Sequence, residues 1–363
     1  MQHRFVIVGY GTMGLVHIKK LSALGQEIAG VVDIDPAARD EAAATGLHVY
    51  PDLAAALADE AVDAVFICTP NEAHHPIAIA ALEAGKNVIT EKPAMLSSAQ
   101  IEEVIEAEKA SGKVFIVHQN RRWDEDFLVI KEMYEGRTVG DVTYVESRID
   151  GSRGIPGDWR RDPNRGGGMV LDWGVHLVDR VLLMVPSAIK TVFARMSYTM
   201  GAPVEDGFSI WITFANGVEA MIACTTDNYA PGPKFRINGT RGTATVDDWA
   251  MNGKIVRRVA DVEPDAIPVV AGQGMTKTMA PRLVDYSKML KVQDNVEVLP
   301  LPRLETDVND FYRNVFDVYE GKAPKVVSNE SVLRCMRVLE AAHLSHETNT
   351  AVDLSATDEY LDH

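Results

Sequence analysis

Short apolar runs alternate with alanine-rich helical patterns through the first third of the chain. The runs are rich in Val and Ile and almost continuous in apolar residues, which is typical of strands buried on both faces of a parallel sheet. They lie at 4–8, 28–33, 48–50, 64–68, 87–90 and 114–118, with helical patterns at 12–24, 73–84 and 98–110. Because this alternation is typical of βαβ units, we predict a doubly wound parallel sheet of six strands.

The pattern changes after residue 121. A helix at 124–135 leads into a strand at 142–149, a turn-rich loop at 150–164 and another helix. Alternating strands over 191–256, with a hairpin signal at Asn216-Gly217, predict an open, mostly antiparallel sheet. Helical patterns return at 306–320 and 330–347, before an acidic tail that we expect to be solvated, whereas 257–303 predicts no clear element. We therefore expect an α/β fold with two domains, 1–121 and 122–363, whose last helices can pack back on the first domain.

Composition narrows the class of protein. The chain has 363 residues and a formal net charge of −16, and such an acidic field repels polyphosphate, so we expect no nucleic-acid partner. The cysteines Cys68, Cys224 and Cys335 are far apart, which favours core residues in a reducing compartment over disulfides or a thiolate metal cluster. The start of the chain lacks a signal-peptide pattern, and no apolar run reaches the roughly 18 residues of a membrane span. These features predict a cytoplasmic protein with no membrane partner.

A glycine-rich turn follows the first predicted strand and opens the first predicted helix. It reads Gly9-Tyr10-Gly11-Thr12-Met13-Gly14, a spacing that lets backbone N–H groups and the helix N-terminus meet a pyrophosphate. Asp33 ends the next strand, where a carboxylate accepts hydrogen bonds from an adenosine ribose diol. A structural turn and a strand-capping Asp explain each feature alone but not their joint spacing. We therefore predict a dinucleotide bound by Gly9, Gly11, Thr12, Met13, Gly14 and Asp33.

The same carboxylate bears on which dinucleotide is bound. Asp33 repels a 2′-phosphate, and the following Ile34 is not the Ser or Arg that would bind one. The sequence therefore favours NAD over NADP as the cofactor.

Two further polar segments follow predicted strands, at the edge where an open α/β sheet places its ligands. Thr69, Asn71 and His74 come after one strand, and Glu91 and Lys92 after the next. Pro93 restricts the backbone and directs Lys92 across the crevice. On a purely structural interpretation, Asn71 caps a helix and Lys92 is a surface cation. We predict instead that all five candidates contact the cofactor.

A run of three glycines at 166–168 precedes a helix with polar residues on one face. Asp172, His176 and Asp179 fall at i, i+4 and i+7, beside an apolar stripe that marks the core. A carboxylate and an imidazole one turn apart can hydrogen-bond and orient a proton acceptor, although they can also be a helix-stabilising pair. A third metal ligand is not evident, so we predict no metal.

Together, Gly9–Gly14, Glu91-Lys92-Pro93 and the glycine run with Asp172 and His176 resemble the Gfo/Idh/MocA family of glucose–fructose oxidoreductases and inositol dehydrogenases. The resemblance spans most of the chain. It implies a Rossmann domain, then an α/β domain whose open antiparallel sheet often forms a homo-oligomer, here a dimer, tetramer or hexamer. It also implies NAD(P)-dependent redox chemistry on a sugar, cyclitol or related polyol.

The resemblance also assigns residues to roles. Lys92, Asp172 and His176 match the family's catalytic trio, and the segment with Asn120, Arg122 and Trp123 resembles its substrate end of the nicotinamide crevice. Because an imidazole ordinarily titrates near ~6.5, we expect His176 to be the general base. Lys92 then orients the hydroxyl and stabilises developing alkoxide, with Asp172 as partner.

The loop 152–165 is the candidate for substrate recognition. It carries Arg153, Trp159 and Arg160, and an aromatic side chain beside hydrogen-bonding groups suits a sugar ring. Its arginines can alternatively meet a carboxylate or phosphate, or neutralise an acidic chain across a subunit contact. The combined prediction is an NAD-dependent dehydrogenase that oxidises a secondary ring hydroxyl of a sugar, glycoside or inositol. The alternatives are an NAD-dependent glycosidase with transient oxidation, a non-catalytic NAD-binding sugar sensor and an NADP-linked keto-sugar reductase.

Overall fold

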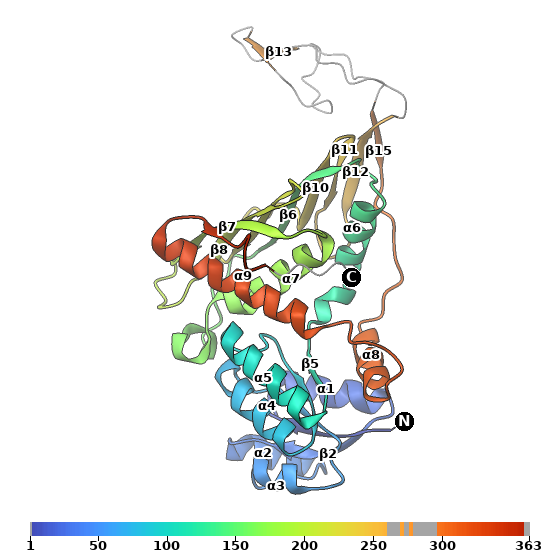
Figure 1. The fold of residues 1–363 in the computed structure, drawn as a ribbon, viewed down its shortest axis with the longest axis vertical. Helices are drawn as coiled ribbons and strands as arrows, with labels where there is room; N and C mark the ends of the chain where they lie inside the picture. Colours follow the sequence, from blue (N-terminus) through green and yellow to red (C-terminus); the bar gives the residue numbers. More distant parts are fainter. Residues whose placement is uncertain (1, 260–268, 272–275, 279–295, 359–363) are drawn as a thin grey trace.

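A computed structural model describes residues 2–259, 269–271, 276–278 and 296–358 (Figure 1). Two sheets are stacked along the long axis of the molecule, with helices between them. The prediction of a doubly wound parallel sheet followed by a large, mostly antiparallel sheet is confirmed.

The N-terminal sheet is parallel and has five strands in the order β2-β1-β3-β4-β5. They are β1 (Arg4–Val8), β2 (Glu27–Val32), β3 (Ala64–Ile67), β4 (Asn87–Thr90) and β5 (Phe115–Val117). The surrounding helices are α1 (Thr12–Ala23), α2 (Pro36–Ala44), α3 (Leu53–Ala58), α4 (His74–Glu83) and α5 (Ser98–Ser111). The carboxyl ends of the strands point toward the second domain and carry the polar segments of the site.

The sixth strand expected at 48–50 does not form. Val49 makes a single bridge to Val31, with one hydrogen bond from the Val31 N–H to His48 and one from the Tyr50 N–H to Val31. Pro51 follows at once and has no N–H to donate, so the pairing cannot continue.

The second sheet has nine strands in the order β15-β12-β11-β10-β6-β9-β8-β7-β16. They are β6 (Val142–Asp150), β7 (Ile189–Ser197), β8 (Gly207–Phe214), β9 (Glu219–Thr225), β10 (Phe235–Gly239), β11 (Gly242–Val246), β12 (Gly253–Arg258), β15 (Val296–Leu299) and β16 (Val352–Asp353). Neighbours are antiparallel except β6 and β9. The predicted hairpin at Asn216-Gly217 joins β8 to β9, and Gly217 has the positive φ of +87° that such a turn requires.

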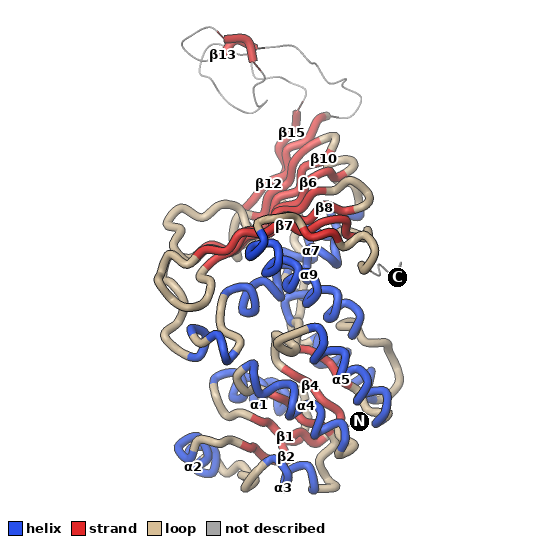
Figure 2. Tube along the Cα trace, turned by 60° about the vertical axis from the view of Figure 1, so that its left-hand side comes forward, coloured by secondary structure: helices blue, strands red, loops and turns tan. Residues whose placement is uncertain are grey.

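Helices cover one face of this sheet and separate it from the N-terminal domain (Figure 2). They are α6 (Glu125–Glu135), α7 (Val175–Met184) and α9 (Asn329–Thr348). Along β8, Phe208, Ile210 and Ile212 are buried beneath the helices, whereas Trp211 on the opposite face is 41% exposed. The sheet therefore has one core face and one outer face.

The C-terminal segments connect the two domains. Helix α8 (Asp310–Tyr319) lies beside the N-terminal domain, where Tyr312 is fully buried (Figure 1). In the region where no element was predicted, β15 pairs with β12, and the short strands β13 (Val269–Ala271) and β14 (Thr276–Thr278) pair with each other.

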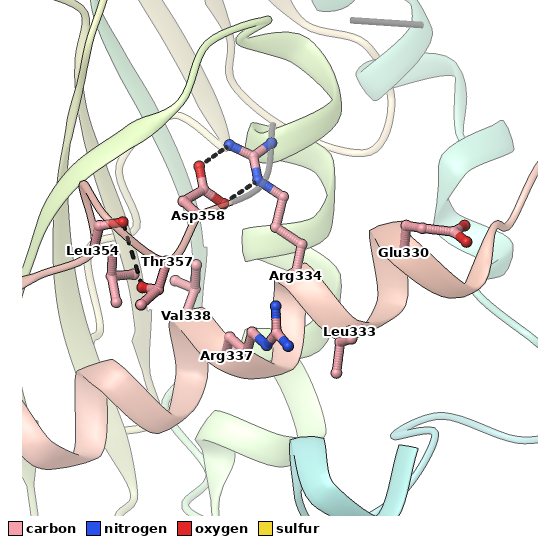
Figure 3. Close-up of a pocket in the computed structure, with 8 residues that line it drawn as sticks. All are labelled: Glu330, Leu333, Arg334, Arg337, Val338, Leu354, Thr357 and Asp358. Atoms are coloured by element: carbon pink, nitrogen blue, oxygen red, sulfur yellow. Dashed lines mark hydrogen bonds and ion pairs between the residues drawn. The ribbon is translucent and has the colours of Figure 1, made fainter. Parts of the chain in front are cut away.

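Most residues of the acidic tail up to 358 are exposed, as expected, although parts of the segment are bonded to the rest of the domain. β16 pairs with β7, and both carboxylate oxygens of Asp358 accept hydrogen bonds from Arg334 of α9. The end of the tail, 359–363, lies outside the described residues. A small hollow between α9 and this segment is lined by Arg334, Arg337 and Asp358, among others (Figure 3). Its lining contains none of the predicted site residues. Across the described ranges, no helix is both long and apolar enough to cross a bilayer.

Candidate active site

The glycine turn between β1 and α1 fits a pyrophosphate. A Cβ at Gly9, whose φ is +101°, would lie 2.6 Å from the Cys68 carbonyl oxygen, and a Cβ at Gly14 would lie 2.1 Å from the Gly9 carbonyl oxygen. These two glycines permit close backbone packing. Gly11 differs, because a Cβ there would meet nothing within 4 Å. Gly11 is the N-cap of α1 and offers no capping side chain, so the N–H groups of the first turn, at Thr12 and Met13, remain available to an anion.

Asp33 sits beside this turn, at the end of β2. Its carboxylate accepts the Tyr10 N–H at 2.7 Å and the Asp35 N–H at 2.8 Å, which fixes its orientation while lone pairs remain for a ribose diol. The next residue, Ile34, is 98% exposed and offers an apolar surface to the adenosine end of a dinucleotide. The residues present therefore fit NAD.

The segments after β3 and β4 contribute unequally to the crevice. Thr69 Oγ1 is buried without a hydrogen-bond partner among the described residues, and its contact with the cofactor stays a prediction. Asn71 instead donates its Nδ2 to the Gly166 carbonyl at 2.9 Å, so it ties two loops together and does not cap a helix. The ring nitrogens of His74 lie 2.9 and 3.0 Å from the carbonyl oxygens of Pro93 and Thr69. The buried His74 thus connects the segments after β3 and β4, and its contact with the cofactor stays a prediction.

Lys92 and Asp172 meet across the two domains. Lys92 Nζ donates to Asp172 Oδ1 at 2.7 Å and to the Asp172 carbonyl oxygen at 2.8 Å. The second carboxylate oxygen of Asp172 lies 3.6 Å from Arg160 Nε. Although burial alone would raise it, the charges of Lys92 and Arg160 lower the pKa of Asp172. The carboxylate is therefore ionised at neutral pH and holds the ammonium in place.

His176 is near this pair but does not bond to Asp172, contrary to the sequence prediction. Residues Val170–Gly174 form a single π-helical turn, η5, before α7 begins. Hydrogen bonds in a π turn run from i to i+5, so residues four apart no longer stack as they do in an α-helix. Nδ1 of His176 is buried and has no partner within the described part of the chain. Burial, followed by the positive charges of Lys92, Arg121 and Arg180, places the pKa of His176 well below 6.5. The imidazole is therefore neutral at neutral pH.

Two domain models of one oxidoreductase family match this chain. Residues 3–119 match its NAD-binding Rossmann-fold domain, and residues 127–245 match its C-terminal domain. The chain belongs to the Gfo/Idh/MocA family. The predictions of this family, of a Rossmann domain and of NAD as cofactor are confirmed.

Solved structures and relatives agree with this assignment. The structure of an NAD-binding protein from Listeria innocua is 45% identical, covers 97% of this chain and 99% of that chain, and has a TM-score of 0.89. The structure of GenD2 from gentamicin A biosynthesis in complex with NAD is 26% identical, covers 98% of this chain and 97% of that one, and has a TM-score of 0.75. A scyllo-inositol 2-dehydrogenase (NADP+) from Bacillus subtilis is 24% identical over 96% of this chain and 95% of its own. The protein is an NAD-binding oxidoreductase, from a family that acts on CH–OH groups.

In this Gfo/Idh/MocA protein a buried network lies beneath Lys92. One oxygen of Glu91 is 2.7 Å from His17 Nε2 and 2.9 Å from His118 Nδ1, and the other accepts the Lys92 N–H. His17 Nδ1 lies 2.7 Å from the hydroxyl oxygen of Tyr312 on α8. The Glu91 carboxylate is thus turned into the protein, and a contact of this residue with the cofactor stays a prediction. Sequence reasoning missed His17, His118 and Tyr312, since only the fold brings these distant positions together.

The geometry of this network is that of hydrogen bonds. Within the described ranges, His17, Glu91 and His118 form a group whose donor atoms are close enough to share a metal ion. Ligands of a tetrahedral zinc ion are separated by about 3.3 Å, however, because each lies about 2.0 Å from the metal. The shorter N···O distances of 2.7 and 2.9 Å, and the further bond from His17 to Tyr312, account for the group without an ion.

The Arg122 side chain forms hydrogen bonds to other parts of the protein. Its Nε donates to Asp179 at 2.8 Å and its Nη2 to the other Asp179 oxygen at 2.5 Å, while Nη1 donates to the Val326 carbonyl. The side chain is buried, which corrects the expectation that it meets substrate. Both carboxylate oxygens of Asp179 accept these hydrogen bonds from Arg122, so Asp179 does not share one polar face with Asp172 and His176 as predicted. Arg122 fastens η2 (Asn120–Trp123) to α7 instead.

The remaining substrate candidates come from the loop 152–165 and from η2. Arg160 stacks on Trp159, with its Cζ 4.6 Å from the ring centroid, and approaches Asp172, so this part of the loop reaches the Lys92–Asp172 pair. Arg153 is exposed and makes no hydrogen bond or ion pair with the described residues. In η2, Asn120 is half-buried at the start of the helix, and Trp123 packs edge-on against Phe311 of α8.

Proposed function

We propose that this oxidoreductase oxidises a secondary ring hydroxyl of a sugar, glycoside or inositol to the ketone, with NAD as the hydride acceptor. The observation that carries the proposal is the Lys92–Asp172 pair at the carboxyl end of β4, with the neutral His176 beside it. The printed activity of the Bacillus subtilis relative, a scyllo-inositol dehydrogenase, supports the substrate class.

The three side chains divide the proton chemistry. When bound, NAD accepts the hydride that leaves the carbinol carbon. The hydroxyl proton leaves in the same step, and His176 accepts it because its imidazole is neutral. Lys92, held by Asp172, donates a hydrogen bond to the substrate oxygen and stabilises its developing negative charge. One proton and one hydride leave the alcohol, and each has an acceptor.

The test is replacement of the proposed base. His176→Asn should lower turnover on a panel of polyols by about 10²- to 10⁴-fold, because the proton loses its acceptor. NAD affinity, measured by calorimetry, should remain unchanged, since the glycine turn and Asp33 are untouched. The exposed His48 offers a matched control, and His48→Asn should leave both quantities unchanged. Unaltered turnover in His176→Asn would show that the proposed base is wrong.

Three other functions give different results in the same assay. A glycosidase that oxidises transiently releases sugar without accumulating reduced cofactor, and a non-catalytic sensor gives no turnover on any polyol. An NADP-linked reductase binds NADP more tightly than NAD. The Asp33 carboxylate argues against an NADP-linked reductase, because its negative charge would face the 2′-phosphate of NADP and repel it.

We also propose that the protein works in the cytoplasm as a homo-oligomer built through the outer face of the nine-stranded sheet. Cys68, Cys224 and Cys335 are free thiols, which supports a reducing compartment. On the outer face, Trp211 and Phe193 pack together with their ring centroids 5.9 Å apart, and Trp211 is 41% exposed. Exposed aromatic residues of this kind are enriched at protein interfaces.

A further inference from the structure

A stack of aromatic rings and a guanidinium lies next to His176. The Cζ of Arg121 is 4.7 Å from the ring centroid of Trp173 and 4.9 Å from that of Trp249. The Trp173 ring is in turn 5.9 Å from the His176 ring. Arg121 comes from η2, Trp173 from η5 and Trp249 from the loop between β11 and β12. Residues from three separate segments therefore pack in one row that ends at His176, the proposed base.

The guanidinium in this stack has an edge available for hydrogen bonding. Its Cζ lies over both indole rings, and Nη1 donates to Asp124 Oδ2 at 2.9 Å. The other N–H groups of Arg121 have no partner in the part of the chain that the structure describes, and the side chain is 26% exposed. Stacking fixes the plane of the guanidinium, so its free N–H groups are held in place before any ligand arrives.

Arg121 differs in this respect from the other cations near His176. Lys92 is bonded to Asp172, and Arg180 is 1% exposed beneath the site. Together these three cations make the surroundings of His176 positive, as their lowering effect on its pKa indicates. Arg180 is buried, and Lys92 has a single N–H left after its two bonds to Asp172, whereas Arg121 is 26% exposed and only its Nη1 has a partner among the described residues.

Carboxylate is the group that this arrangement fits. A planar guanidinium matches a planar carboxylate through two parallel hydrogen bonds, and such charge-assisted bonds are stronger than those to a neutral hydroxyl. A single indole separates the guanidinium from the imidazole, a span that a six-carbon ring acid can bridge between its carboxylate and a ring hydroxyl.

We propose that the substrate is a sugar acid or cyclitol acid, whose carboxylate is bound by Arg121 while a ring hydroxyl meets His176. This inference rests on the proposed dehydrogenase function and narrows its substrate class. A neutral polyol leaves the Arg121 edge without an acceptor, so the protein discriminates against it.

The test compares matched pairs of compounds, such as methyl glucuronide with methyl glucoside and methyl galacturonide with methyl galactoside. In the wild-type enzyme at least one acid should exceed its neutral partner in kcat/KM by about 10- to 100-fold, the range expected for a charge-assisted hydrogen-bonded pair. Arg121→Gln should bring the ratio to within a few-fold of one. Arg137→Gln, a change at an exposed arginine beyond α6, should leave the ratio as it is.

Binding is measured separately so that this inference and the redox function can fail independently. Calorimetry of the NAD-loaded protein should show binding of the acid that is lost in Arg121→Gln, while NAD affinity and thermal midpoint stay at wild-type values. Equal turnover of acids and neutral sugars would overturn the carboxylate site and leave the dehydrogenase standing. Acid binding that depends on Arg121 without any turnover would support the site and overturn the redox function. Absence of both acid preference and acid binding would overturn the carboxylate site.

Discussion

Lys92 Nζ lies 2.7 Å from Asp172 Oδ1, although 80 residues separate them in the chain. Lys92 leaves the N-terminal sheet at the end of β4, and Asp172 lies in η5 at the entrance to α7. Both side chains are about one-fifth exposed, so their interaction is less screened than a surface ion pair. This contact fixes the ammonium, whose charge lowers the pKa of His176, and joins the two domains at the proposed reacting centre.

Removing the charge of Asp172 tests what this contact contributes. Asp172→Asn keeps the shape and an oxygen acceptor but leaves the ammonium without its counter-charge. We expect turnover to fall by about 10- to 100-fold, as for loss of a hydrogen bond to a charged group, with NAD affinity retained. Steady-state kinetics and calorimetry measure the two quantities. Wild-type turnover in this variant would show that the pairing is only structural.

The pH dependence of the oxidation should report the depressed pKa of His176. Only the neutral imidazole accepts a proton, so the rate falls as pH drops through the pKa of His176. Because burial and three cations place that pKa well below 6.5, the acid limb of kcat/KM should lie at distinctly lower pH than for an ordinary histidine. A pH profile of kcat/KM, measured with saturating cofactor, checks the position of this limb. The range from about pH 4.5 to 8 brackets the ordinary value of roughly 6.5. A limb at or above 6.5 would contradict it.

The free energy of unfolding should fall as the pH is lowered, because His17 is buried in its neutral form. Burial lowers the pKa of His17 to about 4, while an unfolded chain titrates its histidines near 6.5. Between these values the unfolded state binds more protons, so the free energy of unfolding falls as pH falls from 6.5 to 4. His17 contributes up to about 3 kcal/mol of this change.

Urea denaturation at pH 7, 6, 5 and 4 measures the predicted loss of stability. His17→Gln removes the titrating group, so the variant should be less stable than wild type at pH 7 but less sensitive to acid between pH 6.5 and 4. An equal slope in both proteins would show that His17 does not carry the effect.

Substitutions in the glycine turn should distinguish glycines that the fold requires from glycines that only NAD binding requires. Gly11→Ala adds a methyl group that touches nothing in the protein, at an ordinary φ of −81°, so the free energy of unfolding should change by less than about 0.5 kcal/mol. The same methyl group occupies the space above the first turn of α1, so NAD affinity should fall by about tenfold or more.

Gly14→Ala provides the contrast. Its Cβ would lie 2.1 Å from the Gly9 carbonyl oxygen, so this variant should lose stability as well as affinity. Thermal denaturation and calorimetry distinguish the two cases, and a Gly11→Ala protein with wild-type NAD affinity would place the pyrophosphate elsewhere.

The proposed oligomer interface can be tested with one charge. Trp211→Glu puts a carboxylate on the outer face of the sheet, on the third strand from the β16 edge, where association would bury it. We expect a smaller assembly by light scattering, with NAD affinity unchanged because the Rossmann domain is remote from this face (Figure 2). Lys254→Glu on β12, nearer the edge of the same sheet, serves as a charge control. An unchanged mass in Trp211→Glu would exclude this face as the interface.

Local patterns were sufficient where one segment determines the outcome. The continuous apolar run of β1, the glycine spacing after it and Asp33 at the end of β2 all depend on neighbours in the chain, and the structure has them as predicted. The pattern at 48–50 was misleading because a single bridge resembles a strand in sequence, and Pro51 prevented its extension.

Side-chain partners could not be predicted in the same way. Helical spacing suggested that Asp172 pairs with His176, but the π-helical turn shifts their positions and the carboxylate turns to Lys92 of the other domain. Arg122 was expected at the substrate, yet its guanidinium is held by Asp179, 57 residues away. Neither partner is visible in a local pattern.

The sequence by itself determined the family, the order of the two domains and the dinucleotide turn with NAD as cofactor, because motif spacing and hydrophobic periodicity are local properties. It also singled out Lys92, Asp172 and His176 as the groups that we propose for the chemistry. Only the tertiary structure decided which of these groups bond to one another, that Glu91 faces inward to His17 and His118, and that Arg121 is stacked between Trp173 and Trp249. Such contacts join residues far apart in the chain. They depend on how the domains pack and on where a buried polar group can find a partner.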